Sequence, residues 1–412
     1  MVRLRAARSV PSRRARSEHV CIVVQNLPVP FDRRVWLECQ ALRDHGYEVS
    51  VVCPKGPGDP AYAELDGVHL YKYRPFPPIT RQALFVAEYL YSIVASFVNL
   101  LRAWRRRPFG TVQLCNPPDV LWAAAAPFKV FRRVKVVFDQ HDLCPELYLS
   151  RFPDGPAAIH RALLATERIT YALADRVISM NESYRGVARR RSGKAPHRVR
   201  VVRTGPDPTR MRRAEPDPAA RRGHRYLLAY LGVMGPQDGV DLALHAMHHI
   251  VHTRGRTDVA LILIGDGDAG PGLRRLAGEL KLDDAVLFTG RIPDAEVARL
   301  LSTADIGLSP DPRNPLNDVS TMNKTMEYMA YELPVVAFDL VETRVSAGAA
   351  ALYAEPNSAE DFGDLILELL DDAPRRRAMG VTGRRRVEEV LAWRCQVPAY
   401  LELYDDLSGH HR

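Results

Sequence analysis

Short runs of apolar residues alternate with longer stretches that mix apolar and polar positions along most of this chain. The short runs are rich in Val, Ile and Leu, which predicts buried strands, and the longer stretches repeat their apolar positions at helical spacing. The first unit predicts a strand at Val20–Gln25, a helix from Arg34 that Gly46 ends, and a strand at Glu48–Pro54. Such units favour parallel sheets, which bind ligands at the carboxyl ends of their strands.

The pattern falls into two series of such units, separated by a stretch with little hydrophobic period. Residues 205–225 are rich in Pro, Arg and Asp, which is typical of an interdomain linker. We therefore expect an α/β protein with two Rossmann-like domains. The expected divisions are a basic disordered tail at 1–18, a first domain at 19–204, the linker, a second domain at 226–390 and a C-terminal helix within 391–412.

The longest apolar segment runs from Ala83 to Arg107. Its polar interruptions recur every three or four residues, so on a helix they form one narrow stripe beside a wide apolar surface. That surface and the arginines at its end predict a helix lying on an acidic membrane, while a helix buried against the first sheet explains the pattern equally well. The carboxylate near its start argues against a spanning helix. The stripe consists of Glu88, Ser92, Ser96, Asn99 and Arg102.

The net charge indicates which kinds of partner suit the protein, and the cysteines indicate the redox environment in which it works. The formal net charge of the 412 residues is +8, which suits anionic partners such as phosphates, acidic membranes or nucleic acid without choosing among them. The six cysteines are scattered, with no C-x-x-C pair. We therefore expect reduced, packed cysteines in a cytoplasmic protein, and no metal or other cofactor. The N-terminus lacks an apolar run of signal-peptide length.

The segment from Asn314 to Asp339 carries the strongest candidate chemistry. It predicts a polar loop, a helix at Thr321–Ala330 with Thr321 as its N-cap, and a buried strand. A helix N-terminus favours anions, and Lys324 and Glu327 lie three residues apart on one face. A cation for phosphate beside a carboxylate for sugar hydroxyls is what a nucleotide-sugar site requires. A capped helix with a surface ion pair is the plainer alternative.

Two glycine-rich loops of the second domain suggest phosphate binding. The first contains Gly232 and Gly235, where backbone N–H groups can approach a phosphate closely. The second, Gly265–Gly270, spells G-x-G-x-x-G, which would suggest a dinucleotide site. That site also needs an acidic residue after the next strand, but here the strand ends in Gly290-Arg291. The dehydrogenase interpretation is therefore weak.

In the first domain, polar residues follow two predicted strands at the edge where ligands bind. Asp32 and Arg33 follow the first strand, and His141 and Asp142 follow the strand at 134–138. These side chains could orient an acceptor hydroxyl or a donor sugar, or they could simply belong to solvated loops.

Several of these runs resemble family 4 of the glycosyltransferases, which have the GT-B fold. The matching text is E-Y-M-A from Glu327 followed by L-P-V-V-A, D-R-R-V-W-L-E-C from Asp32, and H-D-L-C-P-E from His141. The resemblance is to enzymes that make bacterial surface polysaccharides. It implies two Rossmann-like domains facing a central cleft, a closing helix that returns to the first domain, and sugar transfer with retention of configuration and no obligatory metal. The implied partners are a nucleotide-diphosphate sugar and a hydroxyl acceptor, including lipid-linked ones, and not nucleic acid.

The resemblance also implies roles for individual residues. Glu327 would hold the ribose, Lys324 with the Gly232 loop the phosphates, and His141 would lie by the donor sugar and acceptor. The family's Arg and Lys in the glycine-rich loop are Val233 and Asp238 here, and its first glutamate is Val319. These departures keep two alternatives open, a sugar-nucleotide epimerase and an inactive binding subunit. The expected catalytic residues are His141, Asp142 and Lys324, and the expected substrate contacts are Gly232, Gly235, Arg291, Asp318, Asn323, Lys324, Glu327, Asp32 and Arg33.

Overall fold

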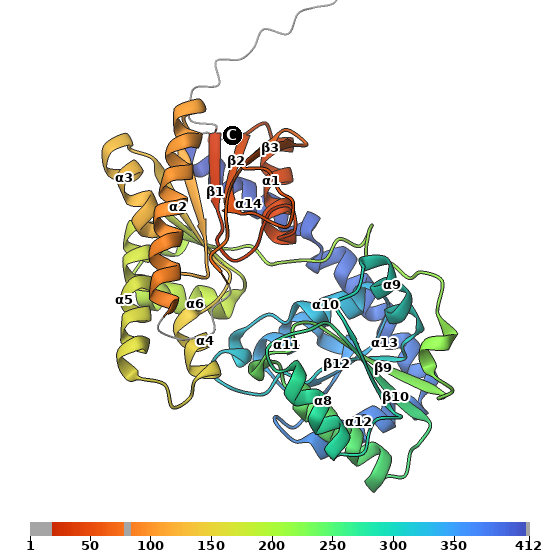
Figure 1. Cartoon of the computed structure of the whole chain (residues 1–412). Helices are drawn as coiled ribbons and strands as arrows, with labels where there is room; N and C mark the ends of the chain where they lie inside the picture. The colour runs from red at the N-terminus through yellow and green to blue at the C-terminus, as the bar shows by residue number, and fades with distance from the viewer. Residues whose placement is uncertain (1–18, 78–83, 409–412) are drawn as a thin grey trace, which may run out of the picture.

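The computed structural model describes residues 19–77 and 84–408, arranged as two sheets in separate lobes (Figure 1). The predicted basic tail at 1–18 and the end of the chain at 409–412 lie outside the described residues. Both sheets are built from buried strands with helices on their two faces, as the predicted α/β class requires. The predicted fold class is therefore confirmed.

The first sheet contains eight strands within the described residues. They are β1 (His19–Val23), β2 (Glu48–Pro54), β3 (Tyr62–Leu65), β4 (Val68–Tyr73), β5 (Thr111–Cys115), β6 (Lys135–Gln140), β7 (Arg176–Ser179) and β8 (Val199–Val201). Their order is β3-β4-β2-β1-β5-β6-β7-β8, and all neighbours are parallel except β3 and β4. The strand order reverses between β1 and β5, so a crevice is expected outside their carboxyl ends.

The second sheet contains six parallel strands within the described residues. They are β9 (Tyr226–Leu231), β10 (Val259–Ile264), β11 (Val286–Gly290), β12 (Ile306–Ser309), β13 (Val335–Phe338) and β14 (Ala351–Ala354). The order β11-β10-β9-β12-β13-β14 reverses between β9 and β12. The corresponding crevice lies beside the glycine-rich loop that follows β9.

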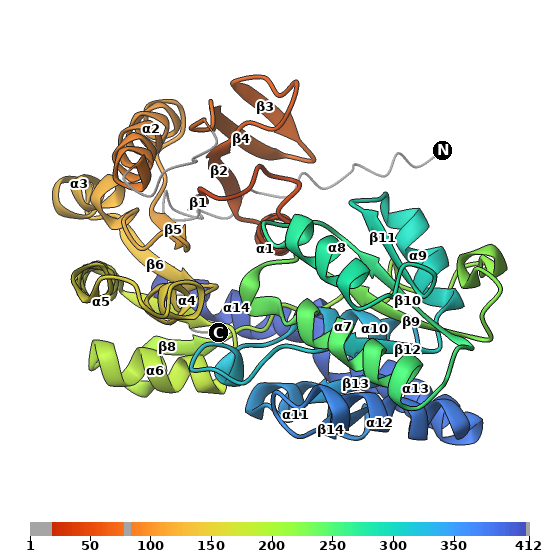
Figure 2. The ribbon, with the colours of Figure 1, turned by 60° about the horizontal axis from the view of Figure 1, so that its bottom comes forward.

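Helices cover both faces of each sheet (Figures 1 and 2). In the first domain, α1 packs on one face, and α2 and α3 pack on the other. The helices of this domain are α1 (Arg33–Asp44), α2 (Leu84–Arg106), α3 (Trp122–Arg132), α4 (Cys144–Arg151), α5 (Ala157–Leu173) and α6 (Glu182–Ser192). Those that follow are α7 (Val240–His248), α8 (Gly270–Glu279), α9 (Asp294–Thr303), α10 (Asn323–Ala330), α11 (Val341–Ala347), α12 (Ala359–Asp371), α13 (Ala373–Arg386) and α14 (Trp393–Ser408).

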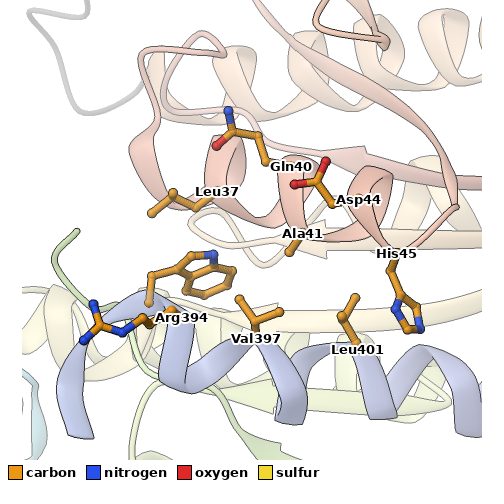
Figure 3. Close-up of a pocket in the computed structure, with 9 residues that line it drawn as sticks. Leu37, Gln40, Ala41, Asp44, His45, Arg394, Val397 and Leu401 are labelled. Carbon is orange, nitrogen blue, oxygen red and sulfur yellow. The ribbon is translucent and has the colours of Figure 1, made fainter. Parts of the chain in front are cut away.

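The C-terminal helix α14 leaves the second domain and packs into the core of the first. Trp393, Tyr400, Leu403 and Tyr404 lie in the same apolar cluster as β1, β2 and α1. Figure 3 shows the outer side of this contact, a groove of about 380 Å³ between α1 and α14. Because α14 comes from the far end of the chain, it ties the two domains together through the core of the first.

Helix α2 packs in an unexpected orientation. The middle of its polar stripe faces inward, since Ser92, Ser96 and Asn99 are at most 3% exposed, whereas Arg102 at its end is exposed. Some of its apolar residues, including Leu100 and Ala103, lie in the core of the first domain. Others face outward, namely Val86 (65%), Leu90 (59%), Val94 (61%) and Val98 (38%). The helix therefore packs on the first sheet, as one of the two predicted alternatives requires, and it also presents an apolar surface. Among the helices in the described ranges, none is both long enough and apolar enough to cross a membrane.

Some element boundaries differ from the predictions. The β3–β4 hairpin is not predicted from the sequence, since its outer strand is short and mostly exposed. The first predicted strand, Val20–Gln25, corresponds to β1, which runs from His19 to Val23. Helix α13 ends at Arg386 and continues as a π-helical turn at Val387–Leu391.

Candidate active site

The loop after β6 carries His141 and Asp142, and Asn116 after β5 fixes its shape. Asn116 Oδ1 accepts the backbone N–H of His141 (2.6 Å) and of Asp142 (3.2 Å). Asn116 Nδ2 donates to the carbonyl oxygen of Asp142 (2.7 Å). Burial raises the pKa of Asp142. The two predicted residues are thus held rigidly at the carboxyl edge of the first sheet.

The imidazole of His141 contacts a buried ion pair. Asp139 Oδ2 lies 2.7 Å from His141 Nε2, and Arg34 Nη2 lies 2.9 Å from Asp139 Oδ1. Burial would raise the pKa of Asp139, but the charges of Arg34 and His141 outweigh it and hold that pKa well below its usual range. An ionised carboxylate only accepts hydrogen bonds, whereas Arg34 Nε, which lies 3.1 Å from the same Nε2, only donates them. Nε2 of the ring therefore lies between an acceptor and a donor.

A metal ion is a poor fit to this cluster. In the described part of the chain, Cys115, Asp139 and His141 form the one group that could hold a metal. The Arg34 guanidinium already neutralises Asp139 there, so a divalent cation would meet a fixed positive charge. Burial raises the pKa of Cys115 well above its ordinary value, which keeps the thiol protonated, whereas a metal ligand must be a thiolate.

In the second domain, the helix that carries Lys324 begins later than predicted. Helix α10 starts at Asn323, and Met322 takes the cap position. Thr321 is not the N-cap, so that prediction is wrong. Its Oγ1 instead accepts a hydrogen bond from Asn181 Nδ2 of the first domain (2.9 Å). Asn323 is exposed at the start of the helix.

Lys324 is held between two carboxylates. Its Nζ lies 2.5 Å from Asp311 Oδ1 and 3.9 Å from Asp238 Oδ1. Burial would lower the pKa of Lys324, but the two carboxylates outweigh it and raise that pKa. A surface ion pair between Lys324 and Glu327, the plainer alternative from the sequence, is therefore wrong.

The glycine-rich loop lies against this lysine. A Cβ placed on Gly232, whose φ is +155°, would come within 3.4 Å of Lys324 Cε. The next glycine of the loop, Gly235, already has a partner for its backbone N–H, which donates to Asp238 Oδ2 (2.9 Å). One N–H expected to meet a phosphate is thus engaged by the loop's own aspartate, the residue that stands where the family usually has lysine.

Glu327 faces the first domain. Arg33 Nη1 lies 4.0 Å from Glu327 Oε1, and Arg33 Nη2 lies 2.5 Å from Asp294 Oδ1 on α9. Burial raises the pKa of Glu327, and the charge of Arg33 opposes that rise. Beside this contact, the Arg291 guanidinium carbon lies 4.7 Å from the centre of the Phe31 ring. Phe31 before α1 and Arg33 at its start therefore contact three side chains of the second domain, Arg291, Asp294 and Glu327.

Asp32 has a structural position. Its side chain is buried and accepts the N–H of Val35 (3.1 Å), so it caps α1. The cap orients the two arginines that follow, of which Arg34 points to Asp139 and His141 and Arg33 points across to Glu327. Consecutive residues of one helix turn thus bring the candidate groups of both domains together.

The sequence did not predict Arg34 as a residue of the candidate site. The available signal was its spacing to Glu38, because four residues place both side chains on one helix face. Nothing in that spacing tells a buried pair from an exposed one, and arginine is rarely buried.

Asp318 and Val319 do not join the Lys324 group: Asp318 contacts other residues of the second domain, and Val319 lies at the contact between the domains. Asp318 Oδ1 accepts the N–H of Val341 at the start of α11 (3.2 Å) and lies 3.7 Å from Arg313 Nε. Val319 packs on an apolar cluster formed by both domains, which includes Leu143 and Leu316. The position of the family's first glutamate is therefore an apolar contact in this protein.

The arrangement of two Rossmann-like domains with a returning C-terminal helix defines the GT-B class of fold. Sucrose-phosphate synthase from Thermosynechococcus elongatus superposes with a TM-score of 0.75 over 96% of this chain and 100% of that chain, at 19% identity. WaaG, a glycosyltransferase involved in lipopolysaccharide biosynthesis, superposes with a TM-score of 0.69 over 95% of this chain and 100% of its own, at 17% identity.

The sequence families are consistent with that class. Residues 32–210 match the family described as Glycosyltransferase Family 4, and residues 225–372 match Glycosyl transferases group 1. The chain belongs to the family 4 glycosyltransferases.

Curated relatives match parts of the chain. One is a GDP-mannose-dependent monoacylated alpha-(1-6)-phosphatidylinositol monomannoside mannosyltransferase of Corynebacterium glutamicum, 32% identical over 38% of this chain and 41% of the relative. Another is alpha-maltose-1-phosphate synthase of Mycolicibacterium smegmatis, 29% identical over 59% of this chain and 66% of the relative. The matched segments thus span between two fifths and two thirds of these relatives' lengths.

Proposed function

We propose that this protein is a retaining glycosyltransferase that moves a sugar from a nucleotide diphosphate to a hydroxyl acceptor, in the synthesis of cell-surface polysaccharide or glycolipid. The observation that carries the proposal is the pair Arg33 and Arg34, two consecutive residues of which one contacts Glu327 of the second domain and the other contacts His141 of the first. A nucleotide held at Glu327 would place its sugar toward His141. The GDP-mannose dependence in the name of the Corynebacterium relative supports a nucleotide-sugar donor.

In the proposed complex, each domain has a distinct task. Glu327 accepts ribose hydroxyls in place of Arg33, and Lys324 beside the Gly232 loop meets the diphosphate and stabilises the charge of the leaving group. His141 and Asp142, held by Asn116, meet the donor sugar and the acceptor hydroxyl. Catalysis then rests on positioning and electrostatics. Retention of configuration is the outcome that the family 4 resemblance implies.

The test is a binding screen followed by a transfer assay. UDP- and GDP-sugars are screened by thermal shift, because a true donor stabilises the native state by mass action. Glu327→Ala should weaken binding of the donor roughly tenfold to a hundredfold, as expected for the loss of about 1.5–3 kcal/mol of charge-assisted hydrogen bonding. His141→Ala should abolish transfer and leave nucleotide binding intact. A wild-type protein that no nucleotide sugar stabilises would contradict the proposal.

Two observations keep the alternatives in the test. Asp238 and Val319 stand where the family usually has a lysine and a glutamate that bind the donor. The Asp238 carboxylate accepts the N–H of Gly235, and Val319 packs in an apolar cluster. An epimerase would cleave its donor without any acceptor extract. An inactive binding subunit would bind nucleotide and cleave nothing. Donor consumption with and without extract separates these outcomes from transfer.

We also propose that α2 holds the enzyme on an acidic membrane, at the inner face of the plasma membrane. Its outward stripe consists of Val86, Leu90, Val94 and Val98, and the neighbouring α3 also exposes two apolar side chains, Val130 and Phe131. Basic residues lie at the C-terminal ends of both helices and suit anionic headgroups. They are Arg102, Arg105, Arg106, Arg107, Arg132 and Arg133.

Liposome flotation tests this surface. Leu90→Gln with Val94→Gln should release the protein from vesicles containing anionic lipid, and high salt should weaken binding because it screens the arginines. Val381→Gln is the matched control, since Val381 of α13 is equally exposed (61%) but lies in the second domain. Equal binding by the double variant and the wild type would reject the membrane surface.

A further inference from the structure

The buried polar groups below His141 continue beyond Asp139 to the C-terminal helix. Gln113 of β5 donates from Nε2 to Glu38 Oε2 (2.7 Å) and to Asp139 Oδ2 (3.1 Å). Its Oε1 accepts from the hydroxyl groups of Tyr400 (2.8 Å) and Tyr404. Both hydrogens and both lone pairs of the amide are thus in use. The amide therefore cannot turn over without breaking all four contacts.

The two tyrosines belong to the segment where the chain passes between the domains. The N–H of Trp393, at the start of α14, donates to the carbonyl oxygen of Pro206 in the linker (3.2 Å). A Cβ on Gly205 would lie only 2.0 Å from the carbonyl oxygen of Leu391. The segment that leaves the first domain and the segment that returns to it are therefore in contact here. A change in the angle between the domains would act on this point first, and α14 continues from it to Gln113.

We propose that Gln113, Tyr400 and Tyr404 are positioning residues that couple the C-terminal helix to the orientation and protonation of His141. The tyrosine hydroxyls fix the amide of Gln113, the amide fixes the carboxylate of Asp139, and the carboxylate holds the imidazole. The catalytic role of His141 rests on the proposed function. The coupling itself is a property of the folded protein.

The charges around the ring make it sensitive to this chain of contacts. Burial and the neighbouring Asp139 raise the pKa of Glu38 well above its ordinary value. The imidazole contacts the Asp139 carboxylate and the Arg34 guanidinium, so a small shift of Asp139 changes the balance of charge at the ring. The charged and titratable groups near the ring are Arg34 and Glu38 from α1, Asp139 from β6, Cys115 from β5 and the adjacent Asp142.

The experiment is a nuclear magnetic resonance titration of the full-length protein with nitrogen-labelled histidine. The His141 signal is identified by its loss in His141→Ala. The tautomer and the titration of the wild type are the reference. In the double variant Tyr400→Phe and Tyr404→Phe, the amide of Gln113 is no longer fixed and donates less to Asp139, which leaves more negative charge for the imidazolium. The proton affinity of His141 should rise by about threefold or more.

The control is Glu402→Gln, which removes another tie between α14 and the first domain, the ion pair with Arg200. It should leave the His141 titration unchanged. A double variant that titrates like the wild type, or a control that shifts equally, would overturn the coupling. If the double variant does not fold, Tyr400→Phe and Tyr404→Phe are measured singly, and each should shift the titration in the same direction by less, because each removes one of the two hydrogen bonds to Gln113 Oε1.

The measurement needs no substrate, so its failure differs from failure of the proposed function. A shift in the titration together with no sugar transfer would keep the coupling and reject the function. Sugar transfer with no shift in the titration would keep the proposed function and reject the coupling.

Discussion

In each domain, the candidate site contains a basic side chain between two carboxylates, and the two arrangements differ in their distance from water. In the first domain, Arg34 is 6% exposed and its partners Glu38 and Asp139 are fully buried. In the second domain, Lys324 is 10% exposed, and of its two partners Asp311 is 2% exposed but Asp238 is 19% exposed. The first group lies under the candidate catalytic histidine, whereas the second opens toward the expected ligand.

The difference separates a structural use of charge from a binding use. A buried charge that loses its partner has nothing to replace it, so Arg34 and Asp139 depend on each other. A charge near the surface can exchange a carboxylate for a ligand phosphate, and Lys324 is placed for such an exchange. Arginine and lysine suit these tasks, because the planar guanidinium holds several acceptors rigidly while the flexible ammonium can move between partners.

The largest expected effect is on stability. Arg34→Ala leaves the buried Asp139 carboxylate without its cation, which should lower the free energy of unfolding by about 3–5 kcal/mol. Urea unfolding followed by circular dichroism measures it. Arg33→Ala is the matched control one residue earlier, because its exposed pairs should be worth under about 1 kcal/mol. Equal losses would remove the distinction between the two residues.

The second effect is on ligand affinity. Lys324→Ala should weaken binding of a nucleoside diphosphate roughly tenfold to a hundredfold, as expected for about 1.5–3 kcal/mol of charge-assisted contact. Binding of the free nucleoside should change little. Isothermal titration with both ligands measures the contrast. Equal losses for nucleoside and diphosphate would show that Lys324 does not act on phosphate.

The third effect has the opposite sign. Asp238→Asn removes a carboxylate that competes for Lys324 and, with it, a negative charge beside the expected phosphates. A nucleoside diphosphate should therefore bind about three- to tenfold more tightly, a gain of roughly 0.7–1.4 kcal/mol. The same titration measures it, with Asp241→Asn on α7 as a control near the loop. Weaker binding would mean that Asp238 supports the site by holding Gly235.

The smallest effect is on the pH dependence of stability. Burial raises the pKa of Asp238 in the folded protein, and Lys324 only partly opposes this rise. A raised carboxyl pKa contributes stability that is complete below the unfolded pKa of about 3.9 and is lost as pH rises through the folded value. Asp238→Asn should therefore raise the Tm slightly at pH 7 and not at pH 4. A gain that is larger in acid would contradict this sign.

The fold could be predicted because its signals are periodic and local. Apolar runs such as Val335–Phe338 and the glycine that ends α1 determine strands and helix ends without knowledge of the rest. The motifs around His141 and Glu327 identified the candidate regions for the same reason. Their partners could not be predicted, since Arg34, Asp311 and Gln113 act through contacts between elements distant in the sequence.

The direction of α2 shows another limit of sequence reasoning. The sequence shows the polar stripe of α2, but the spacing of polar residues says only that the helix has two different faces. It does not say which face packs on the sheet. Burying Ser92 and Ser96 requires a close approach of small side chains to the sheet, which periodicity does not report. Thr321 was misplaced similarly, because its hydroxyl has a partner in the other domain.

The return of α14 has a consequence for synthesis of the protein on the ribosome. Domains generally fold from the N-terminus as the chain emerges. Here the core of the first domain needs Trp393, Tyr400 and Tyr404, which emerge after the whole second domain. The nascent first domain therefore keeps an apolar face and the Gln113 amide uncovered until the second domain has been made and α14 follows it. A chain released before Trp393 would carry two sheets and still expose a surface that chaperones recognise.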